Sequence, residues 1–490
     1  MIFNSLDFIL FLPIVFFLYW FLQNRLRSQN FFVVIASYVF YGWWDWRFLI
    51  LIAITSLSSF VCGVIMERAE KVTERKACNF FNIVLNLGIL ATYKYYDFFA
   101  ENLAALIKSI CGYELDWITL NLILPVGISF YTFQALSYSI DVYKRKITAT
   151  KDPIDFFAYI SFFPQLVAGP IERATNLLPQ FQKSRTFDYG KAVDGLRQML
   201  WGFFKKIVVA DNCAILVDAT WAHYQEQSGL TLIIAAVLFS FQLYCDFSGY
   251  SDIAIGTARL FGINLKKNFD FPYFSRNISE FWRKWHISLM TWFRDYVYIP
   301  LGGSRCSKAK LIRNIFIVFL LSGLWHKPNW TYIAWGGYHA ALISILVLLN
   351  VNTKYEHTVA YNRVLPTLKE TAMMLITFIL VVISRVFSRA ETIGQAFDFI
   401  RCSYKNIAVQ APLFFFPQES LPHSVPFVIV IGLTVLIVIE WLQRNKEHAL
   451  DIGGGTFMSK RWVRWCTYYC ILIMIYLSVN DNQGFVYFQF

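Results

Sequence analysis

The chain has 490 residues, of which 57% are hydrophobic and only 16% are charged, whereas soluble domains carry roughly 25% charged residues. The formal net charge is +12 and the mean hydropathy is +0.46. This composition excludes an ordinary soluble domain. The surplus basic residues lie in short loops between the predicted membrane spans, where they set the orientation of the chain. We therefore expect no nucleic-acid partner. The nine cysteines are scattered without a C-x-x-C pair, and no disulfide framework is expected.

Long apolar windows recur along the chain, and each approaches the roughly 20 residues that a helix needs to cross about 30 Å of hydrocarbon. They predict an all-α, polytopic membrane protein. The first window has no basic residue before it and no small-residue cleavage site, so we expect a retained span rather than a secretory signal. The predicted windows are Leu6–Leu22, Leu49–Met66, Phe80–Tyr93, Leu232–Tyr244, Ile333–Leu349, Met373–Ser384 and Val425–Trp441.

The connections in the first third of the chain alternate in charge. Those at 23–30, 67–77 and 141–152 together hold ten Lys and Arg residues, whereas those near Arg47 and at 101–117 hold two. Loops rich in Lys and Arg stay on the cytoplasmic side of a bacterial inner membrane. Five spans fit this alternation, and we therefore predict that the N-terminus lies outside the cytoplasm.

Two stretches in the middle of the chain, Asp152–Arg197 and Phe269–Gly303, are interrupted by proline and glycine. Non-helical backbone at membrane depth is tolerated only where protein or a water-filled cavity satisfies its polar groups. We therefore expect re-entrant or interfacial helices on the cytoplasmic side. Ordinary spans and the aromatic tail FVYFQF follow in the last third. The interruptions are Pro164, Pro170, Pro179, Pro272, Pro300 and Gly302–Gly303.

Two histidines in aromatic, nearly uncharged surroundings are the main candidates for chemistry. His286 lies in FWRKWHISLMTWF and His326 lies in LLSGLWHKPNW. Imidazole exchanges protons near neutral pH, and it is costly in hydrocarbon unless it faces the protein interior. His326 is placed to take the proton of an alcohol whose oxygen attacks a thioester. The alternatives are a packed histidine at a helix end for His326 and an interfacial anchor for His286, which we expect to share a helical face with Trp282 and Arg283.

Two acidic residues form the second candidate feature. Asp246 and Asp252 lie in QLYCDFSGYSDIAIG, at the predicted end of a span. Carboxylates at membrane depth are usually paired or line a wet path. The available partners are Arg259, Arg276 and Arg283, and the alternative is helix capping by the Asp and Ser side chains.

The third feature is the lysine pair Lys205 and Lys206, in WGFFKKIVVADN. These lysines are expected either to anchor the chain at the cytoplasmic interface or to meet the phosphates of a donor carrier, together with Arg305 and its neighbours. The candidate donor-binding residues are Lys205, Lys206, Arg283, Arg305, Asp246 and Asp252. No Walker A, G-x-G-x-x-G, H-E-x-x-H or G-x-S-x-G sequence is present, which excludes most ATPases, dinucleotide enzymes, zinc proteases and α/β serine hydrolases. The two histidines lack obvious further ligands, and no metal site is expected.

These features occur within six ordered strings that cover most of the chain. Together they resemble the membrane-bound O-acyltransferase family, in the branch that acts on bacterial polysaccharides, and within it the membrane subunits of alginate O-acetyltransferases. One local departure is that Lys327-Pro328 follow His326, where the family often has glycine. The strings are SFFPQLVAGPIERA, GFFKKIVVADN, YCDFSGYSDIAIG, FWRKWHISLMTWFRDYVYIPLGGSR, LSGLWHKPNWTYIAWGGYHA and FVYFQF.

The resemblance implies a fold of about eleven transmembrane helices around a central catalytic channel, with re-entrant helices. It implies that His326 is the catalytic histidine and His286 a second, supporting one. The implied donor is a cytoplasmic acyl thioester, acetyl-coenzyme A in the first instance, and no bound cofactor is expected. The aromatic tail resembles a partner peptide in teichoic acid D-alanylation, which points to Tyr487 as an acyl relay. The alternative for this tail is an interfacial aromatic anchor.

The sequence thus predicts one integral-membrane acyltransferase domain over residues 1–490, with N-terminal spans at 1–150, a catalytic core at 151–345 and C-terminal spans with the tail at 346–490. We expect it in the bacterial inner membrane, in contact with lipid, an extracytoplasmic acetyltransferase partner and polysaccharide export machinery. The expected activity is O-acetylation of an exported polysaccharide. The rivals are a flippase or secondary transporter, which usually shows two matching halves, and a non-catalytic scaffold.

Overall fold

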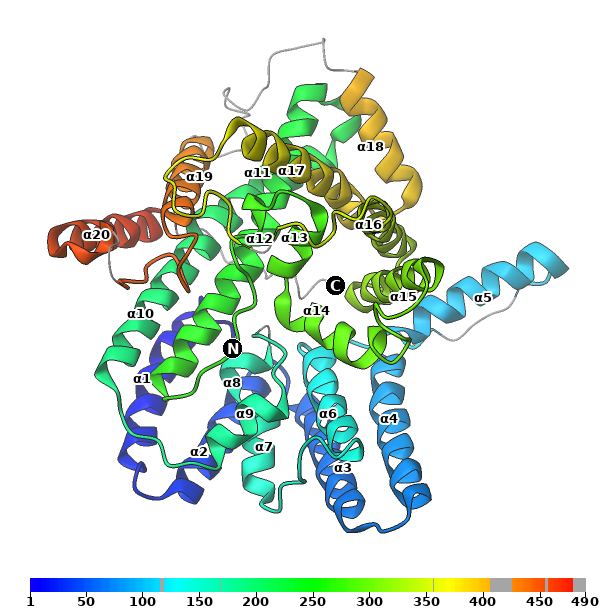
Figure 1. The fold of residues 1–490 in the computed structure, drawn as a ribbon, viewed down its shortest axis with the longest axis vertical. Coiled ribbons are helices and arrows are strands. Elements are labelled where there is room, and N and C mark those ends of the chain that lie inside the picture. The colour runs from blue at the N-terminus through cyan, green and yellow to red at the C-terminus, as the bar shows by residue number, and fades with distance from the viewer. Residues whose placement is uncertain (115–118, 168, 356, 406–424, 454–456, 479–490) are drawn as a thin grey trace. The chain divides into compact units, whose positions relative to one another are not determined.

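The computed structural model describes residues 1–114, 119–167, 169–355, 357–405, 425–453 and 457–478, and these residues form helices and connections without any strand. The predicted all-α fold class is therefore confirmed for them. Contacts divide the chain into two compact units (Figure 1). Unit 1 consists of Met1–Ala192 with Ala258–Leu265, and unit 2 consists of Val193–Thr257 with Lys266–Phe490. The prediction of a single functional domain stays a prediction.

The helices of the first part of the chain are mostly long elements followed by short ones. The described elements are α1 (Leu6–Phe21), α2 (Leu26–Gly42), η1 (Trp46–Phe48), α3 (Leu49–Arg68), α4 (Val72–Lys94), α5 (Tyr96–Cys111), α6 (Ile128–Tyr143), α7 (Pro153–Ser161), α8 (Phe163–Leu166) and α9 (Ala174–Phe181).

The rest of the chain begins with α10, whose first residues still belong to unit 1. The described elements are α10 (Tyr189–Phe203), η2 (Phe204–Ala210), α11 (Asp211–Ala222), η3 (Tyr224–Glu226), α12 (Gly229–Leu260), η4 (Pro272–Phe274), α13 (Ile278–Lys284), α14 (Ile287–Phe293), η5 (Arg294–Tyr298), α15 (Lys308–His326), α16 (Trp330–Leu348), α17 (Leu368–Arg389), α18 (Ile393–Lys405), α19 (Val425–Leu442), η7 (Phe457–Ser459) and α20 (Arg461–Leu477).

Within the described part of the chain, six helices are long and apolar enough to cross a membrane: the continuous stretch Trp46–Arg68, α12, α15, α16, α17 and α19. Five of them match predicted windows, and α15 adds a sixth. The predicted first window corresponds to α1, which is apolar but shorter. The predicted window Phe80–Tyr93 lies inside α4, which carries charged residues in its first turns. The expected number of about eleven spans is not confirmed.

The candidate spans expose apolar side chains and bury polar ones, as helix α17 illustrates. Its Leu375, Ile376 and Ile379 are each more than half exposed, whereas Ser384 and Arg385 are buried. A soluble protein rarely exposes such a continuous apolar face, while a lipid-facing helix requires one. The pattern supports a multi-pass membrane protein.

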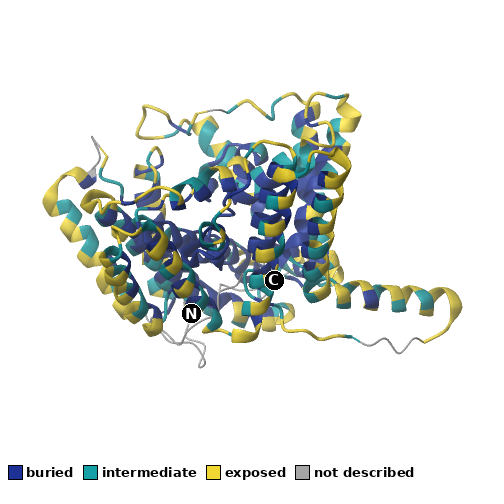
Figure 2. Cartoon of the chain, turned by 90° about the horizontal axis from the view of Figure 1, so that it is seen from below, coloured by how far each residue is buried: buried dark blue, intermediate teal, exposed yellow. Residues whose placement is uncertain are grey.

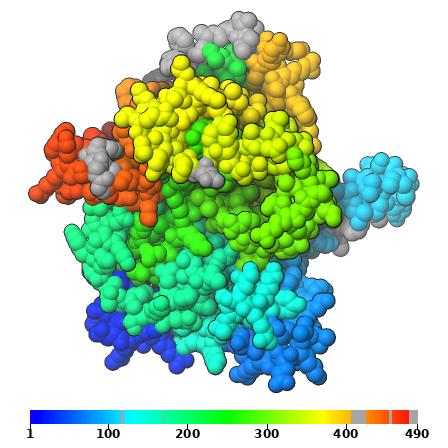
Figure 3. Space-filling view, in the orientation of Figure 1, coloured from blue at the N-terminus to red at the C-terminus, as the bar shows by residue number. Residues whose placement is uncertain are grey.

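Helices α3 and α4 of unit 1 are joined by polar side chains. Asn82 and Asn86 of α4 are fully buried, and the Ser59 hydroxyl of α3 donates to Asn82 Oδ1 at 3.2 Å. Polar bonds of this kind hold spans together where lipid offers no hydrophobic drive. Helix α5 departs from this packing, since Ala100 is its only buried residue. Figure 2 shows it mostly exposed, and Figure 3 shows it standing away from the other helices of its unit.

The two interrupted stretches form short helices, as their prolines and glycines predicted. Phe162 has φ −49° and ψ 109°, which separates α7 from α8. Asn277 has an extended backbone, and its Oδ1 accepts the N–H of Glu280 at 2.7 Å, which starts α13. One boundary differs, because α10 begins at Tyr189 inside the first predicted stretch. The re-entrant or interfacial placement of these helices stays a prediction.

Candidate active site

The two histidines singled out by the sequence lie side by side in unit 2. The centroids of the His286 and His326 rings are 6.3 Å apart. Both are buried, with 1% of His286 and 8% of His326 exposed. His326 is the last residue of α15, and His286 lies between α13 and α14. Two segments distant in sequence therefore bring two imidazoles together.

The backbone at His286 is in the left-handed region, with φ 45° and ψ 52°. Such a conformation is uncommon for a residue other than glycine and persists where the surroundings fix it. Here hydrogen bonds bracket it, from the Asp270 N–H to the Lys284 carbonyl and from the Ile287 N–H to the Asn268 carbonyl, both at 2.9 Å. The prediction that His286 shares a helical face with Trp282 and Arg283 was wrong, because α13 ends at Lys284, before His286.

The His286 ring contacts one polar side chain and several aromatic ones. Its Nδ1 lies 3.1 Å from Asn268 Oδ1. The Phe247 ring meets it edge to face, with the two ring centroids 4.7 Å apart. His286 lies outside the six candidate spans, and burial lowers its pKa to about 3. The ring is therefore neutral at physiological pH.

The His326 ring is enclosed by aromatic residues of α15 and α16. Trp325 and Trp335 meet it edge to face at 5.0 and 5.4 Å. The two helices approach closely at glycine: a Cβ on Gly323 would lie 2.2 Å from the Tyr332 carbonyl oxygen, and one on Gly336 would lie 2.3 Å from the carbonyl oxygen of Phe319. Only glycine permits this spacing, which presses the α16 aromatic residues against the end of α15.

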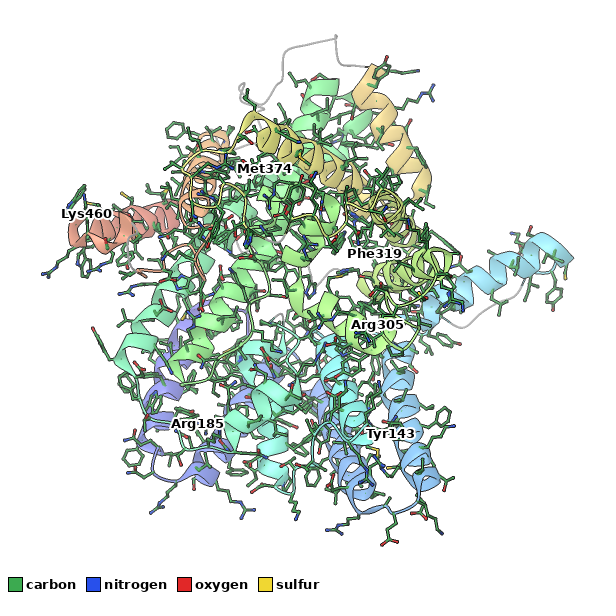
Figure 4. All side chains as sticks on the ribbon, viewed as in Figure 1. Tyr143, Arg185, Arg305, Phe319, Met374 and Lys460 are labelled. Atoms are coloured by element: carbon green, nitrogen blue, oxygen red, sulfur yellow. The ribbon has the colours of Figure 1, made fainter. Side chains whose placement is uncertain are left out.

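A third histidine lies on the far side of Trp335. His339 is fully buried on α16, and its Nδ1 accepts the Trp282 indole N–H at 3.2 Å. Phe319, labelled on α15 in Figure 4, lies against the same ring. Histidine and tryptophan rings thus alternate from α13 to α16, and water is poorly accommodated among them.

The predicted lysines and aspartates lie together, as two ion pairs. Lys205 Nζ lies 2.5 Å from Asp252, and Lys206 Nζ lies 2.8 Å from both Asp246 and Asp211. The two aspartates pair with lysines rather than with the arginines that the sequence offered as partners. The capping alternative was wrong, because both aspartates lie inside the long helix α12 rather than at its end. A π-helical turn, η2, carries the two lysines, and such turns often occur at functional sites.

Close helix packing explains why these charges meet. A Cβ on Gly202 of α10 would lie 2.6 Å from the Gly249 carbonyl oxygen of α12. The start of η2 is therefore held against the middle of α12. Beside the pairs, the Tyr244 hydroxyl donates to Glu440 of α19 at 2.9 Å. Glu440 was missed, although an acid within an apolar window is a recognisable signal.

The two predicted arginines lie at the surface, apart from these clusters. Arg283 is exposed and donates to the carbonyls of Asn352 and Tyr355 at 3.1 and 2.6 Å. Arg305 is exposed in the loop that precedes α15, where Figure 4 labels it. Tyr487 lies outside the described residues. Among those residues, no group of three or more His, Cys, Asp and Glu side chains is arranged to hold a metal ion.

Sequence reasoning also missed two residues that contact His286 or its neighbour Trp285. Asn268 contacts the ring directly, but an asparagine in a connection carries no distinctive signal. Arg385 of α17 is buried, and its guanidinium lies 4.4 Å from the centroid of the Trp285 ring. An arginine inside an apolar window is a signal that could have been used.

The chain is similar to known membrane acyltransferases. A profile of the MBOAT, membrane-bound O-acyltransferase family, matches residues 146–383, which include both histidines. The protein named probable alginate O-acetylase of Pseudomonas aeruginosa is 42% identical over 81% of this chain and 73% of its own length. The protein of that name in Pseudomonas putida is 39% identical over the whole of both chains. A peptidoglycan O-acetyltransferase of Helicobacter pylori is 30% identical over 100% of this chain and 98% of its own.

These similarities extend through every element that builds the histidine pair and the ion pairs. Identity of 39% along the full length of both chains is ample to establish a family. The chain belongs to the membrane-bound O-acyltransferase family and is a membrane-embedded O-acyltransferase.

Proposed function

We propose that this enzyme moves an acetyl group from a cytoplasmic thioester, acetyl-coenzyme A, across the inner membrane for O-acetylation of an exported polysaccharide. The observation that carries the proposal is the buried pair of His286 and His326, enclosed by aromatic rings and 6.3 Å apart. The names of the relatives, which act on alginate and peptidoglycan, support a polysaccharide as the final acceptor.

His326 acts as the general base in the proposed reaction. Its neutral imidazole accepts the proton of an acceptor hydroxyl while that oxygen attacks the thioester carbonyl carbon. The tetrahedral intermediate then collapses with cleavage of the carbon–sulfur bond. The imidazolium returns the proton to the departing thiolate, so that an ester and a free thiol result and no proton is gained or lost.

The surroundings suit this chemistry because they hold few charges. The tryptophans around His326 exclude water, which would otherwise hydrolyse the thioester. His286 supplies a second neutral imidazole next to the base. The thioester carbonyl and the acceptor oxygen must meet beside these two rings, since effective transfer requires the reacting atoms within about 3.5 Å.

Of the predicted donor-binding residues, the exposed ones are the better candidates. Arg283 and Arg305 present guanidinium groups at the surface, and guanidinium binds phosphate well. Lys205 and Lys206 are occupied by carboxylates. In our proposal Asp246 and Asp252 act with these lysines to hold η2 against α12, and the arginines meet the phosphates of the donor.

Delivery to the polysaccharide would need an outward-facing acceptor. In our proposal Tyr487 receives the acetyl group on its phenol and passes it to an extracytoplasmic transferase. Tyr487→Phe should then stop acetylation of the polymer and also lower the release of free thiol, because its phenol is the hydroxyl that accepts the acetyl group. Equal polymer acetylation by this variant would reject the relay.

The N-terminus is proposed to lie outside the cytoplasm, on the basis of loop charge.

The decisive experiment incubates the purified enzyme with labelled acetyl-coenzyme A and follows release of the free thiol. His326→Ala should lower the rate by about 10²–10⁴-fold, the usual contribution of a general base. His223→Ala, which changes an exposed histidine of the same unit, serves as the control and should retain wild-type activity. Full activity in a folded His326→Ala enzyme would remove this assignment.

A further inference from the structure

Asn268 is bonded to the two residues that follow His286 as well as to the His286 ring. It is fully buried, with 0% exposed. Its main-chain oxygen accepts the Ile287 N–H at 2.9 Å. Its side-chain Oδ1 accepts the Ser288 N–H at 3.3 Å and the Ser288 hydroxyl at 2.9 Å. One residue thus binds the segment that carries the histidine through main chain and side chain together.

These bonds settle which way the Asn268 amide points. A backbone N–H can only donate, so the atom that faces the Ser288 N–H must be the amide oxygen. The amide nitrogen then faces the opposite way, and Nδ2 donates to Ser251 Oγ of α12 at 3.2 Å. The side chain is therefore fixed at both ends, by α12 on one side and by the start of α14 on the other.

The protonation of His286 follows from this orientation. Its Nδ1 lies 3.1 Å from the amide oxygen, which can only accept. Nδ1 must therefore carry the hydrogen, and in a neutral ring Nε2 keeps its lone pair. The left-handed backbone at His286 and the Phe247 edge at 4.7 Å restrain the ring in this position.

We infer that Asn268 is a positioning residue that holds His286 as the Nδ1–H tautomer, with the lone pair on Nε2. The inference rests on the proposed function, in which His286 stands beside the base. A lone pair at Nε2 can accept a hydrogen bond from the acceptor hydroxyl or from protonated His326. The opposite tautomer would present a donor there and compete with His326 for the same oxygen.

The neutral amide matters as much as its geometry. A carboxylate at position 268 would accept the same bonds but would favour a protonated ring. The other titratable or charged groups that face this region are His326 of α15, Arg385 of α17 across the Trp285 ring, and the Lys205–Asp252 pair next to Ser251. They stay unchanged in the substitutions that test the inference.

The test compares Asn268→Asp with Asn268→Leu in the purified full-length enzyme, using acetyl-coenzyme A cleavage from pH 5.5 to 9. Asn268→Asp should return the His286 pKa from about 3 to about its ordinary value of 6.5, because a carboxylate beside Nδ1 stabilises the protonated ring against the burial that lowers the pKa. The ratio of the rate at pH 6 to the rate at pH 8.5 should then fall about fourfold below that of the wild type. Asn268→Leu should lower the rate about 10²-fold at every pH, as expected for a misplaced catalytic group.

Two controls separate positioning from general damage. Asn212→Asp buries a carboxylate elsewhere in unit 2 and should keep the shape of the wild-type pH profile. In a His286→Gln background, Asn268→Asp should produce no further change in that shape. A wild-type profile for Asn268→Asp, or a rate for Asn268→Leu within twofold of the wild type, would overturn the inference.

A spectroscopic measurement on the wild-type protein tests the inference even if the Asn268 variants do not fold. In wild-type protein labelled with ¹⁵N-histidine, the ring signal that disappears in His286→Gln should have the shifts of an Nδ1–H imidazole at pH 7. An Nε2–H signal would overturn the positioning role even if acetyl transfer is established. If the wild type cleaves no acetyl thioester, the proposed function fails, whereas the tautomer is still decided by this spectrum.

Discussion

The histidine pair and the lysine pair of unit 2 are both buried, but they are stabilised by different means. His286 and His326 lie among aromatic rings, and the imidazole of His286 is neutral and bonded to a neutral amide. Lys205 and Lys206 lie against three carboxylates at 2.5–2.8 Å. A neutral ring keeps a lone pair for chemistry, whereas a paired ammonium group has no such lone pair and is committed to its partners.

This difference separates chemistry from support. Removing an imidazole leaves no unpaired charge, so the cost should appear mainly in rate. Removing a lysine leaves buried carboxylates without a counter-ion, so the cost should appear mainly in stability. Three variants test this division, in order of decreasing effect: Lys206→Met, Gly336→Ala and His286→Gln. The first is expected to change stability, the second both stability and rate, and the third the dependence of stability on pH.

The largest effect is expected for Lys206→Met. Asp246 and Asp211 would lose the cation that lies 2.8 Å from each. Breaking a buried pair in this way costs about 3–5 kcal/mol. Thermal unfolding in detergent should show this loss. An unfolding midpoint equal to that of the wild type would contradict a supporting role for the lysine pair.

Lys71→Met is the matched control for that experiment. Lys71 lies 3.6 Å from Glu74, and both side chains are exposed. Exposed pairs contribute about 0–1 kcal/mol, so this variant should unfold with the wild type. The same substitution then gives a large effect in one place and almost none in the other.

The pairing of Lys206 with Asp246 also shows where sequence reasoning ended. Composition and apolar windows predicted the all-α fold and five of the six candidate spans, because hydrophobicity is a local property. The two histidines, the lysine pair Lys205–Lys206 and the aspartates Asp246 and Asp252 were recognised because each lies in or beside an apolar stretch of the sequence. The partners of the aspartates were predicted wrongly, because the meeting of η2 with α12 depends on a close glycine contact between distant segments. Asn268 offered no local signal, since its role arises only from the packing around it.

The next effect in size is expected for Gly336→Ala, which tests how α16 encloses His326. The new Cβ would lie 2.3 Å from the main-chain oxygen of Phe319, so the helices must separate. Overpacking of this kind costs about 1–3 kcal/mol, and displacement of Trp335 should also lower the rate of thioester cleavage. Both quantities are measured on the same preparation.

Gly337→Ala provides the control at the adjacent position. Its Cβ would meet only the flexible end of Leu320, at 3.8 Å. Because alanine favours a helix over glycine by about 1 kcal/mol, this variant should be as stable as the wild type or slightly more so, with normal activity. Equal behaviour of the two alanine variants would contradict the close packing of α15 and α16.

The smallest effect is the dependence of stability on pH that arises from His286. Its pKa is lowered by burial from 6.5 to about 3, so below pH 6.5 the unfolded chain binds a proton that the folded chain does not. The free energy of unfolding therefore has its full value above pH 6.5 and decreases as the pH falls towards 3. Between pH 6.5 and 5 the loss amounts to about 2 kcal/mol. His286→Gln removes this proton linkage, and its unfolding midpoint should fall less than that of the wild type over the same interval. His223→Gln, at an exposed position, should follow the wild type. The lysine pair and its carboxylates remain in all three proteins, so the difference between their pH curves isolates the neutral imidazole. Parallel curves would mean that the folded protein accepts a proton on His286 as readily as the unfolded chain does.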